Sequence, residues 1–201
     1  MSEVFVAGGP VMYPLLICSI IALAVIVDRS IIWIRYEKTD GTVSVAELCR
    51  IANCDKPSFP DETKRNVVLS VLRIGLESRS DKSSWSMRQA AAAEVTRMGK
   101  HLGILSTMVS LAPLLGIFGT VLGIIESFQL TGNATLADPA AATGGLAKAL
   151  ITTAFGLGIA MPSLIAFKLF DSKTLRFKSE LETRCTELEW RLGLASSESL
   201  V

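Results

Sequence analysis

Three long runs of apolar residues dominate the hydropathy pattern of this 201-residue chain. They cover residues 11–34, 102–130 and 149–170, and each is long enough to cross about 30 Å of hydrocarbon, for which a helix needs roughly 20 apolar residues. Pro113 and Pro162 interrupt two of the runs, which membrane helices tolerate because neighbours satisfy the freed carbonyl groups. The pattern predicts an all-α integral membrane protein with three transmembrane helices, at 11–35, 102–130 and 145–170.

The segments outside these runs show helical periodicity. Apolar residues recur at helical spacing over 67–76, and an alanine-rich stretch at 86–97 predicts a second helix that leads into the second span. Prolines mark a loop at 53–60. Apolar and charged residues alternate over 174–192, which predicts a helical stalk beyond the third span, with an apolar face formed by Leu175, Phe177, Leu181, Leu188 and Leu192. Residues 195–201 are expected to fray.

The distribution of lysine and arginine predicts the orientation in the membrane. Residues 35–100 contain twelve and the tail from Lys168 contains six, whereas the residues before Asp28 and the 129–147 connection contain none. Basic segments stay in the cytoplasm. We therefore expect a periplasmic N-terminus (1–10), a cytoplasmic helical segment (36–101), a periplasmic loop (131–144) and a cytoplasmic helical tail (171–201), in the bacterial inner membrane. The first run lacks a basic N-terminal region and a small-residue cleavage site, so it is expected to be retained.

Composition narrows the functional classes. Half of the residues are hydrophobic, and the mean hydropathy is +0.45, high for a soluble domain. We find no nucleophile–base set, metal cluster or phosphate-binding loop, so no enzyme activity, cofactor or metal is predicted. Acidic residues mixed into the basic segments, without interleaved aromatics, argue against nucleic acid. The four cysteines show no CxxC spacing and are interpreted as reduced thiols, and His101 as an interfacial side chain.

A stripe of small and polar residues follows one face of the second and third spans. Its members are Gly116, Gly119, Thr120, Gly123, Glu126 and Ser127, and then Ala149, Thr152, Thr153, Gly156, Ala160 and Ser163. Small residues let helix backbones approach closely, so Gly116, Gly119, Gly123 and Gly156 are expected to serve helix packing. Glu126 and Lys148 are open to two interpretations. They either extend to the outer interface, or they line a polar pore together with Thr120, Thr152 and Thr153.

Two segments resemble signatures of the MotA/TolQ/ExbB proton-channel family. Residues 112–128 (APLLGIFGTVLGIIESF) resemble its second-helix signature and residues 145–162 (GLAKALITTAFGLGIAMP) its third-helix signature. The pair Asp28–Arg29 resembles the acidic–arginine pair that ends its first helix. The likeness extends over nearly the whole chain, and the three spans favour the ExbB/TolQ-like branch, because the flagellar stator has a fourth.

The resemblance implies a homopentamer around a dimer of single-span ExbD- or TolR-like subunits. Proton flow would drive movement of that partner, which passes work to a TonB- or TolA-like protein that reaches the outer membrane. Thr120 and Thr153 match the two pore threonines, and the proton-carrying carboxylate would belong to the partner. We expect an ExbB-like subunit for outer-membrane transport, with a TolQ-like envelope-maintenance subunit as the alternative.

Two alternatives come from other classes. A small-solute secondary transporter is disfavoured because no inverted repeat or pair of broken helices is evident. A non-conducting scaffold is disfavoured by the polar band that contains Thr120, Thr153, Glu126 and Lys148.

One position departs from the family pattern, because Lys148 stands where ExbB and TolQ usually have glutamate. If Thr120 and Thr153 share one depth, Glu126 lies about 9 Å and Lys148 about 7.5 Å further outward, at about 1.5 Å of rise per residue. We therefore hypothesise that Glu126 and Lys148 pair at the outer mouth of the pore, which would keep both charged.

Overall fold

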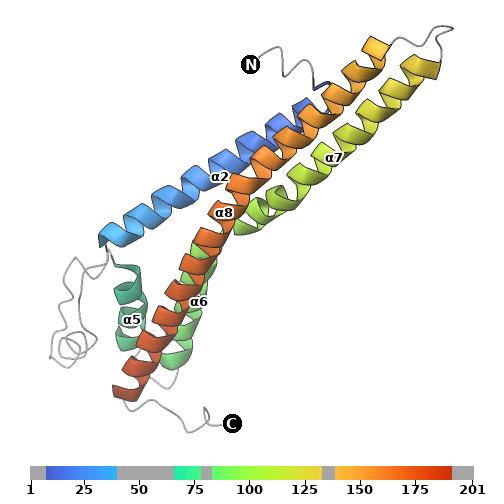
Figure 1. Cartoon of the computed structure of the whole chain (residues 1–201). Helices are drawn as coiled ribbons and strands as arrows, with labels where there is room; N and C mark the ends of the chain where they lie inside the picture. The colour runs from blue at the N-terminus through green and yellow to red at the C-terminus, as the bar shows by residue number, and fades with distance from the viewer. Residues whose placement is uncertain (1–7, 40–65, 78–82, 133–138, 192–201) are drawn as a thin grey trace. The chain divides into compact units, whose positions relative to one another are not determined.

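The computed structural model describes residues 8–39, 66–77, 83–132 and 139–191. These residues form five α-helices and contain no strand, which confirms the all-α prediction (Figure 1). The helices are α2 (Met12–Thr39), α5 (Val67–Glu77), α6 (Ser83–Gly99), α7 (Leu102–Gly132) and α8 (Pro139–Arg191). The predicted loop at 53–60, the frayed end at 195–201, Cys49, Cys54 and Leu192 lie outside the described residues.

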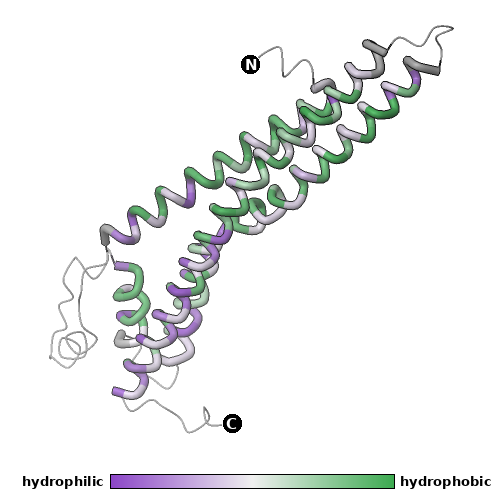
Figure 2. The backbone as a smooth tube through the Cα atoms, in the orientation of Figure 1, coloured by the Kyte–Doolittle hydropathy of each residue, from purple (hydrophilic) through white to green (hydrophobic). Residues whose placement is uncertain are grey.

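Three stretches are long and apolar enough to cross a membrane, as the hydropathy pattern predicts. They lie within Met12–Glu37, Ser84–Gln129 and Thr143–Arg191, and Figure 2 shows the hydrophobic colour along α2, α7 and the first half of α8. The colour of α8 changes to hydrophilic further along, so this one 53-residue helix contains both a span and the predicted stalk (Figure 2).

Two helix boundaries differ from the expectation. The alanine-rich helix does not run directly into the second span, because α6 ends at Gly99 and α7 begins at Leu102. His101 between them has a φ of 67°, in the left-handed region that interrupts a helix. Helix α8 begins at Pro139, inside the segment expected to be a loop, since proline suits the first turn of a helix.

The chain divides into two compact units, and the first comprises Met1–Asp28 and His101–Leu169. In it α2, α7 and the first half of α8 lie side by side, with a core that includes Val11, Met12, Leu15, Ala112 and Ala160 (Figure 1). The outward faces are apolar and exposed, as expected for a surface covered by lipid; they include Ile17, Ile20, Leu114, Ile117, Val121, Ile125 and Ile165. At the start of α7, His101 Nδ1 lies 3.3 Å from Asp28 Oδ2.

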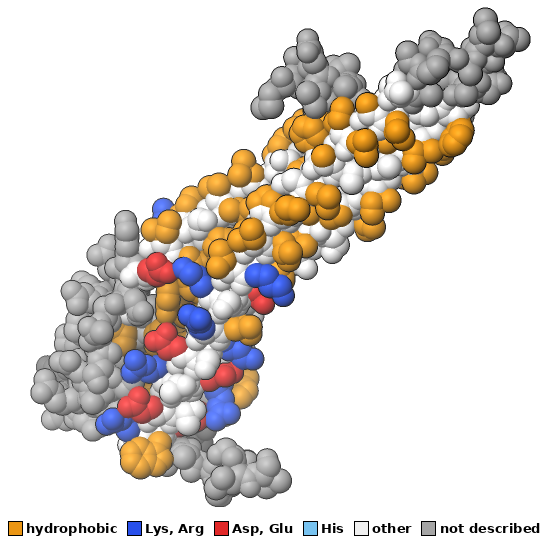
Figure 3. Space-filling view, in the orientation of Figure 1, with side chains coloured by type: hydrophobic (Ala, Val, Ile, Leu, Met, Phe, Trp, Pro, Cys, Tyr) orange, Lys and Arg blue, Asp and Glu red, His pale blue; other side chains and the backbone are white. Residues whose placement is uncertain are grey.

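The second unit comprises Arg29–Lys100 and Phe170–Val201. On the face drawn in Figure 3 it carries the charged side chains, while its core is formed by large apolar residues: Leu72, Met87, Phe177, Leu181, Cys185 and Leu188. Leu175 was expected on the apolar face of the stalk, but it is 60% exposed. The buried face is set by the spacing Phe177, Leu181, Cys185 and Leu188, from which Leu175 is rotated away.

Arg29 has a role in this unit that the sequence did not indicate. Its side chain is buried, and its Nη1 donates hydrogen bonds to the carbonyl oxygens of Arg97 (3.3 Å) and Met98 (3.2 Å). These carbonyls lie in the last turn of α6, where they lack partners within the helix. The guanidinium therefore caps α6 and places a positive charge at the negative end of its dipole.

Candidate functional site

Helices α7 and α8 approach one another through glycine backbones. A Cβ atom added to Gly116 would lie 3.1 Å from the Cα of Thr153, and one added to Gly156 would lie 2.6 Å from the carbonyl oxygen of Ala112. At Gly123 an added Cβ would lie 2.8 Å from the carbonyl oxygen of Gly145. These neighbours are backbone atoms, which cannot rotate away. The stripe therefore holds the two helices closer together than any side chain at these positions would allow.

The close approach brings the two predicted pore threonines together. The hydroxyls of Thr120 and Thr153 are in direct hydrogen-bond contact, and each also lies 3.1 Å from the carbonyl oxygen of Gly116. Thr152 does not join this pair. Its side chain is 1% exposed, packs against Gly119, and donates a hydrogen bond to the carbonyl oxygen of Ala149 at 2.8 Å.

The hydrogen bonding of the threonine pair limits what it can bind. Two hydroxyl groups carry two hydrogens, and three short oxygen–oxygen contacts link Thr120, Thr153 and Gly116. Both hydrogens are therefore used within the group, whereas each hydroxyl oxygen has two lone pairs. The pair consequently presents free acceptors, and it can donate to a ligand only by breaking one of these contacts.

The second polar feature is an ion pair further along the same two helices. Lys148 Nζ donates to Glu126 Oε2 at 2.6 Å, and the side chains are 25% and 49% exposed. The contact expected from the helix rise is thus present in the structure. These are the only Asp, Glu, Lys or Arg residues in 102–132 and 139–167. In water such a half-exposed pair contributes about 0–1 kcal/mol, but within a membrane each charge requires the other.

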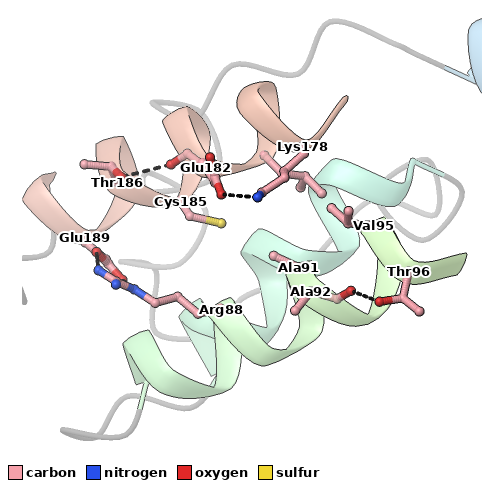
Figure 4. Close-up of a pocket in the computed structure, with 11 residues that line it drawn as sticks. Arg88, Ala91, Ala92, Val95, Thr96, Lys178, Glu182, Cys185, Thr186 and Glu189 are labelled. Atoms are coloured by element: carbon pink, nitrogen blue, oxygen red, sulfur yellow. Dashed lines mark hydrogen bonds and ion pairs between the residues drawn. The ribbon is translucent and has the colours of Figure 1, made fainter. Parts of the chain in front are cut away.

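A hollow in the second unit offers no comparable chemistry. It has a volume of about 680 Å³ between α6 and α8, and Figure 4 shows Cys185 on its wall near the ion pair of Arg88 and Glu189. Arg88 donates to both Glu189 carboxylate oxygens, at 3.0 and 2.9 Å, and these bonds raise the pKa of the guanidinium. Burial, aided by Glu189, raises the pKa of the Cys185 thiol from 9.0 to about 11. A thiol with so high a pKa is unreactive at neutral pH.

Cys18 and Cys185 are both free and buried. Within the parts of the chain that the structure describes, no three His, Cys, Asp or Glu side chains gather in a group able to hold a metal ion.

The fold and the site define a class: a multi-pass membrane protein in which two spans share a glycine- and threonine-rich interface. Residues 61–183, more than half of the chain, match the model of the MotA/TolQ/ExbB proton channel family. The chain belongs to this family, in its ExbB/TolQ-like branch, and is a multi-pass protein of the inner membrane. The family is described as one of proton channels, and its ExbB- and TolQ-named members support an energy-transducing subunit.

Named relatives support the same branch. The biopolymer transport protein ExbB-like 3 of Synechocystis sp. is 28% identical over 191 residues, 91% of this chain and 90% of that protein. ExbB-like 1 of the same organism is 30% identical over 84% of this chain and 69% of its own length. The Tol-Pal system protein TolQ of Pseudomonas aeruginosa is 38% identical, but over 44% of this chain and 38% of its own length.

Proposed function

We propose that this chain is an ExbB-like proton-channel subunit that, with an ExbD-like single-span partner, uses the proton-motive force to energise a TonB-type protein for outer-membrane transport. The observation that carries the proposal is the hydroxyl pair Thr120–Thr153, held inside the α7–α8 interface. Two of the relatives with the longest matches are named as ExbB-like transport proteins, which supports the TonB-type client.

The threonine pair is proposed to recognise the protonated form of the partner's carboxyl group. A carboxylic acid has one O–H to donate, and the pair offers free acceptor lone pairs. A carboxylate has only acceptors, so it would need a hydroxyl hydrogen that is already donated within the group, either to the Gly116 carbonyl oxygen or to the other threonine. The difference favours a neutral carboxyl group beside Thr120 and Thr153, and a charged one where water reaches it. This preference links movement of the partner to proton uptake and release.

Glu126 and Lys148 are proposed to mark the outer mouth of this pathway. At 2.6 Å each compensates the charge of the other, so the mouth stays polar without a net charge that would repel or trap protons. Thr152, which was expected to line the pore, is assigned to the α7–α8 contact because its hydroxyl is buried against Gly119.

The proposed topology follows the lysine and arginine distribution. The N-terminus and the loop between α7 and α8 are periplasmic, and the segments before α7 and after residue 170 are cytoplasmic. We propose that five copies surround two copies of the partner. A TolQ-like role, with TolR- and TolA-like partners, is the second candidate, favoured by the 38% identity to the TolQ relative.

Native mass determination of the chain, expressed alone and with an ExbD- or TolR-like partner, tests the assembly. A pentamer that captures two partner copies is expected. A monomer or dimer that binds neither partner would overturn the proposal. Capture of one partner in preference to the other decides between the two clients.

Proton flux into proteoliposomes tests the site. Thr120→Val and Thr153→Val keep the side-chain volume but remove a hydroxyl, and each is expected to reduce flux about tenfold, as the loss of one hydrogen bond of about 1–2 kcal/mol implies. Thr107→Val is the matched control, because Thr107 is exposed and its hydroxyl donates only to Gly103 of its own helix, at 2.9 Å. Equal flux in all three variants would contradict the assignment.

A further inference from the structure

The chain preceding α2 forms a tight turn that depends on Gly9. Gly9 has a φ of 71°, in the left-handed region that side chains disfavour, and its carbonyl oxygen accepts a hydrogen bond from Met12 N at 3.1 Å. Pro10 occupies the second position of this turn, where its fixed φ is suitable. The turn therefore joins the Gly9 backbone firmly to the first residues of α2.

The open side of Gly9 faces the end of the Lys148 side chain. A Cβ atom added to Gly9 would overlap Lys148 Cε and lie 2.9 Å from Nζ. The Lys148 ammonium thus contacts the Glu126 carboxylate and also lies close to the bare Gly9 backbone. Gly8 differs, because an added Cβ there would meet the Met12 side chain and not Lys148.

We propose that Gly9 is a positioning residue: the turn before α2 closes over Lys148 and holds its ammonium group against Glu126. Three segments of the first unit then contribute to one contact: the turn before α2 provides Gly9, α8 provides the lysine and α7 provides the carboxylate. The consequence for proton flow rests on the function proposed above, whereas the placement of Lys148 by Gly9 does not.

A side chain at position 9 has two separable effects. Alanine adds a Cβ that overlaps Lys148, and it also disfavours the positive φ. Asparagine adds the same Cβ, but it tolerates the left-handed region better than alanine does. If displacement of Lys148 is the main effect, both variants release the lysine. If backbone strain is the main effect, Gly9→Asn resembles the wild type.

Acetylation of the Lys148 amine by the membrane-impermeant reagent sulfo-NHS-acetate provides a readout independent of proton flux. The rate is measured by peptide mass spectrometry on the assembled complex. Glu126→Gln sets the scale, because it removes the ion pair directly. Gly9→Ala and Gly9→Asn are expected to raise the rate about two- to fivefold, the range for loss of a partly exposed ion pair. Gly144→Ala, the matched control on α8, adds a Cβ that meets no atom within 4 Å and is expected to leave it unchanged.

The outcomes separate the two proposals. An unchanged Lys148 rate in Gly9→Asn overturns the positioning role, even if Gly9→Ala fails to assemble. A raised rate in both Gly9 variants but not in Gly144→Ala supports it. A raised rate with unaltered proton flux supports the placement of Lys148 by Gly9 and counts against the pathway proposed through Glu126 and Lys148.

Discussion

Helix α8 contributes to both units of the molecule, and it packs by opposite means in its two halves. In the first unit its glycine and threonine residues lie directly against the α7 backbone. In the second unit its buried face consists of Phe177, Leu181, Cys185 and Leu188, and a hollow of about 680 Å³ separates part of it from α6. One helix thus changes from small to large contact residues at the limit of its apolar stretch.

The surrounding solvent explains the difference. Lipid chains are as apolar as leucine, so burying leucine between membrane helices gains little, and close backbone approach has to provide the attraction. In water, removing apolar surface stabilises by about 25 cal/mol per Å², so large side chains are favoured even where the contact is imperfect. The first interface, formed by α7 and α8 in the first unit, therefore depends on the absence of side-chain volume. The second interface, formed by the buried face of α8 in the second unit, depends on the presence of large side chains.

The largest expected effect is on the second unit. Leu181→Ala removes a side chain that is 0% exposed, and is expected to lower the free energy of unfolding by about 2–5 kcal/mol. Leu175→Ala, at an exposed position of the same helix, is the control and should change it by less than about 0.5 kcal/mol. Tryptophan fluorescence in a denaturant titration measures both, because Trp33, Trp85 and Trp190 all belong to the second unit. Equal effects would contradict a volume-dependent interface.

The opposite change should damage the first unit. Gly156→Ala adds one methyl group 2.6 Å from the Ala112 carbonyl oxygen, and overpacking of this kind destabilises by about 1–3 kcal/mol. Gly158→Ala, two residues along, meets no atom within 4 Å and should be neutral or slightly stabilising, since alanine favours helix. The melting temperature of the detergent-purified protein, followed by size-exclusion chromatography, distinguishes them. If Gly156→Ala were as stable as Gly158→Ala, the interface would not depend on missing volume.

A smaller effect is expected at the ion pair beside the hollow. Arg88→Ala leaves the Glu189 carboxylate, whose side chain is 7% exposed, without its bidentate partner. Because Arg88 itself is 68% exposed, the loss is expected to be about 1–2 kcal/mol rather than that of a fully buried pair. Adding Glu189→Gln should restore much of the stability by removing the uncompensated charge. A double variant no more stable than Arg88→Ala would argue against this explanation.

The sequence predicted the first interface better than the second. Helical spacing identified the stripe that contains Gly116, Thr120 and Thr153. Helix rise put Glu126 nearly level with Lys148 only after the family resemblance had placed Thr120 and Thr153 at one depth. These predictions succeed because two helices that share a stripe have few ways to meet. The separate role of Thr152 was missed, since spacing identifies a face but not which hydroxyl on it is satisfied by its own helix.

Contacts between distant segments could not be predicted in the same way. Arg29 caps α6 at Met98, 69 residues away, and no local pattern identifies that partner. The predicted apolar face of the stalk wrongly included Leu175, because the sequence does not show which residues pack against the stalk. Gly8-Gly-Pro10 was a usable signal, since glycine before proline marks a turn, but its contact with Lys148 depends on the arrangement of three helices.

The smallest expected effect on stability at neutral pH concerns Cys185, which tests whether the second interface is closed despite the hollow beside it. Burial raises the pKa of its thiol from 9.0 to about 11, so between these values the unfolded chain loses a proton that the folded chain keeps. Stability should therefore be unaffected below about pH 9 and fall as the pH rises toward 11.

At pH 8 the thiolate fraction of folded Cys185 is about 100-fold lower than in the unfolded chain, so alkylation of Cys185 by iodoacetamide should be slower by about that factor. Peptide mass spectrometry, with the denatured chain as control, measures the rate. Alkylation as fast as in denatured protein would mean that α6 and α8 separate readily, and that large side chains alone do not keep this interface closed.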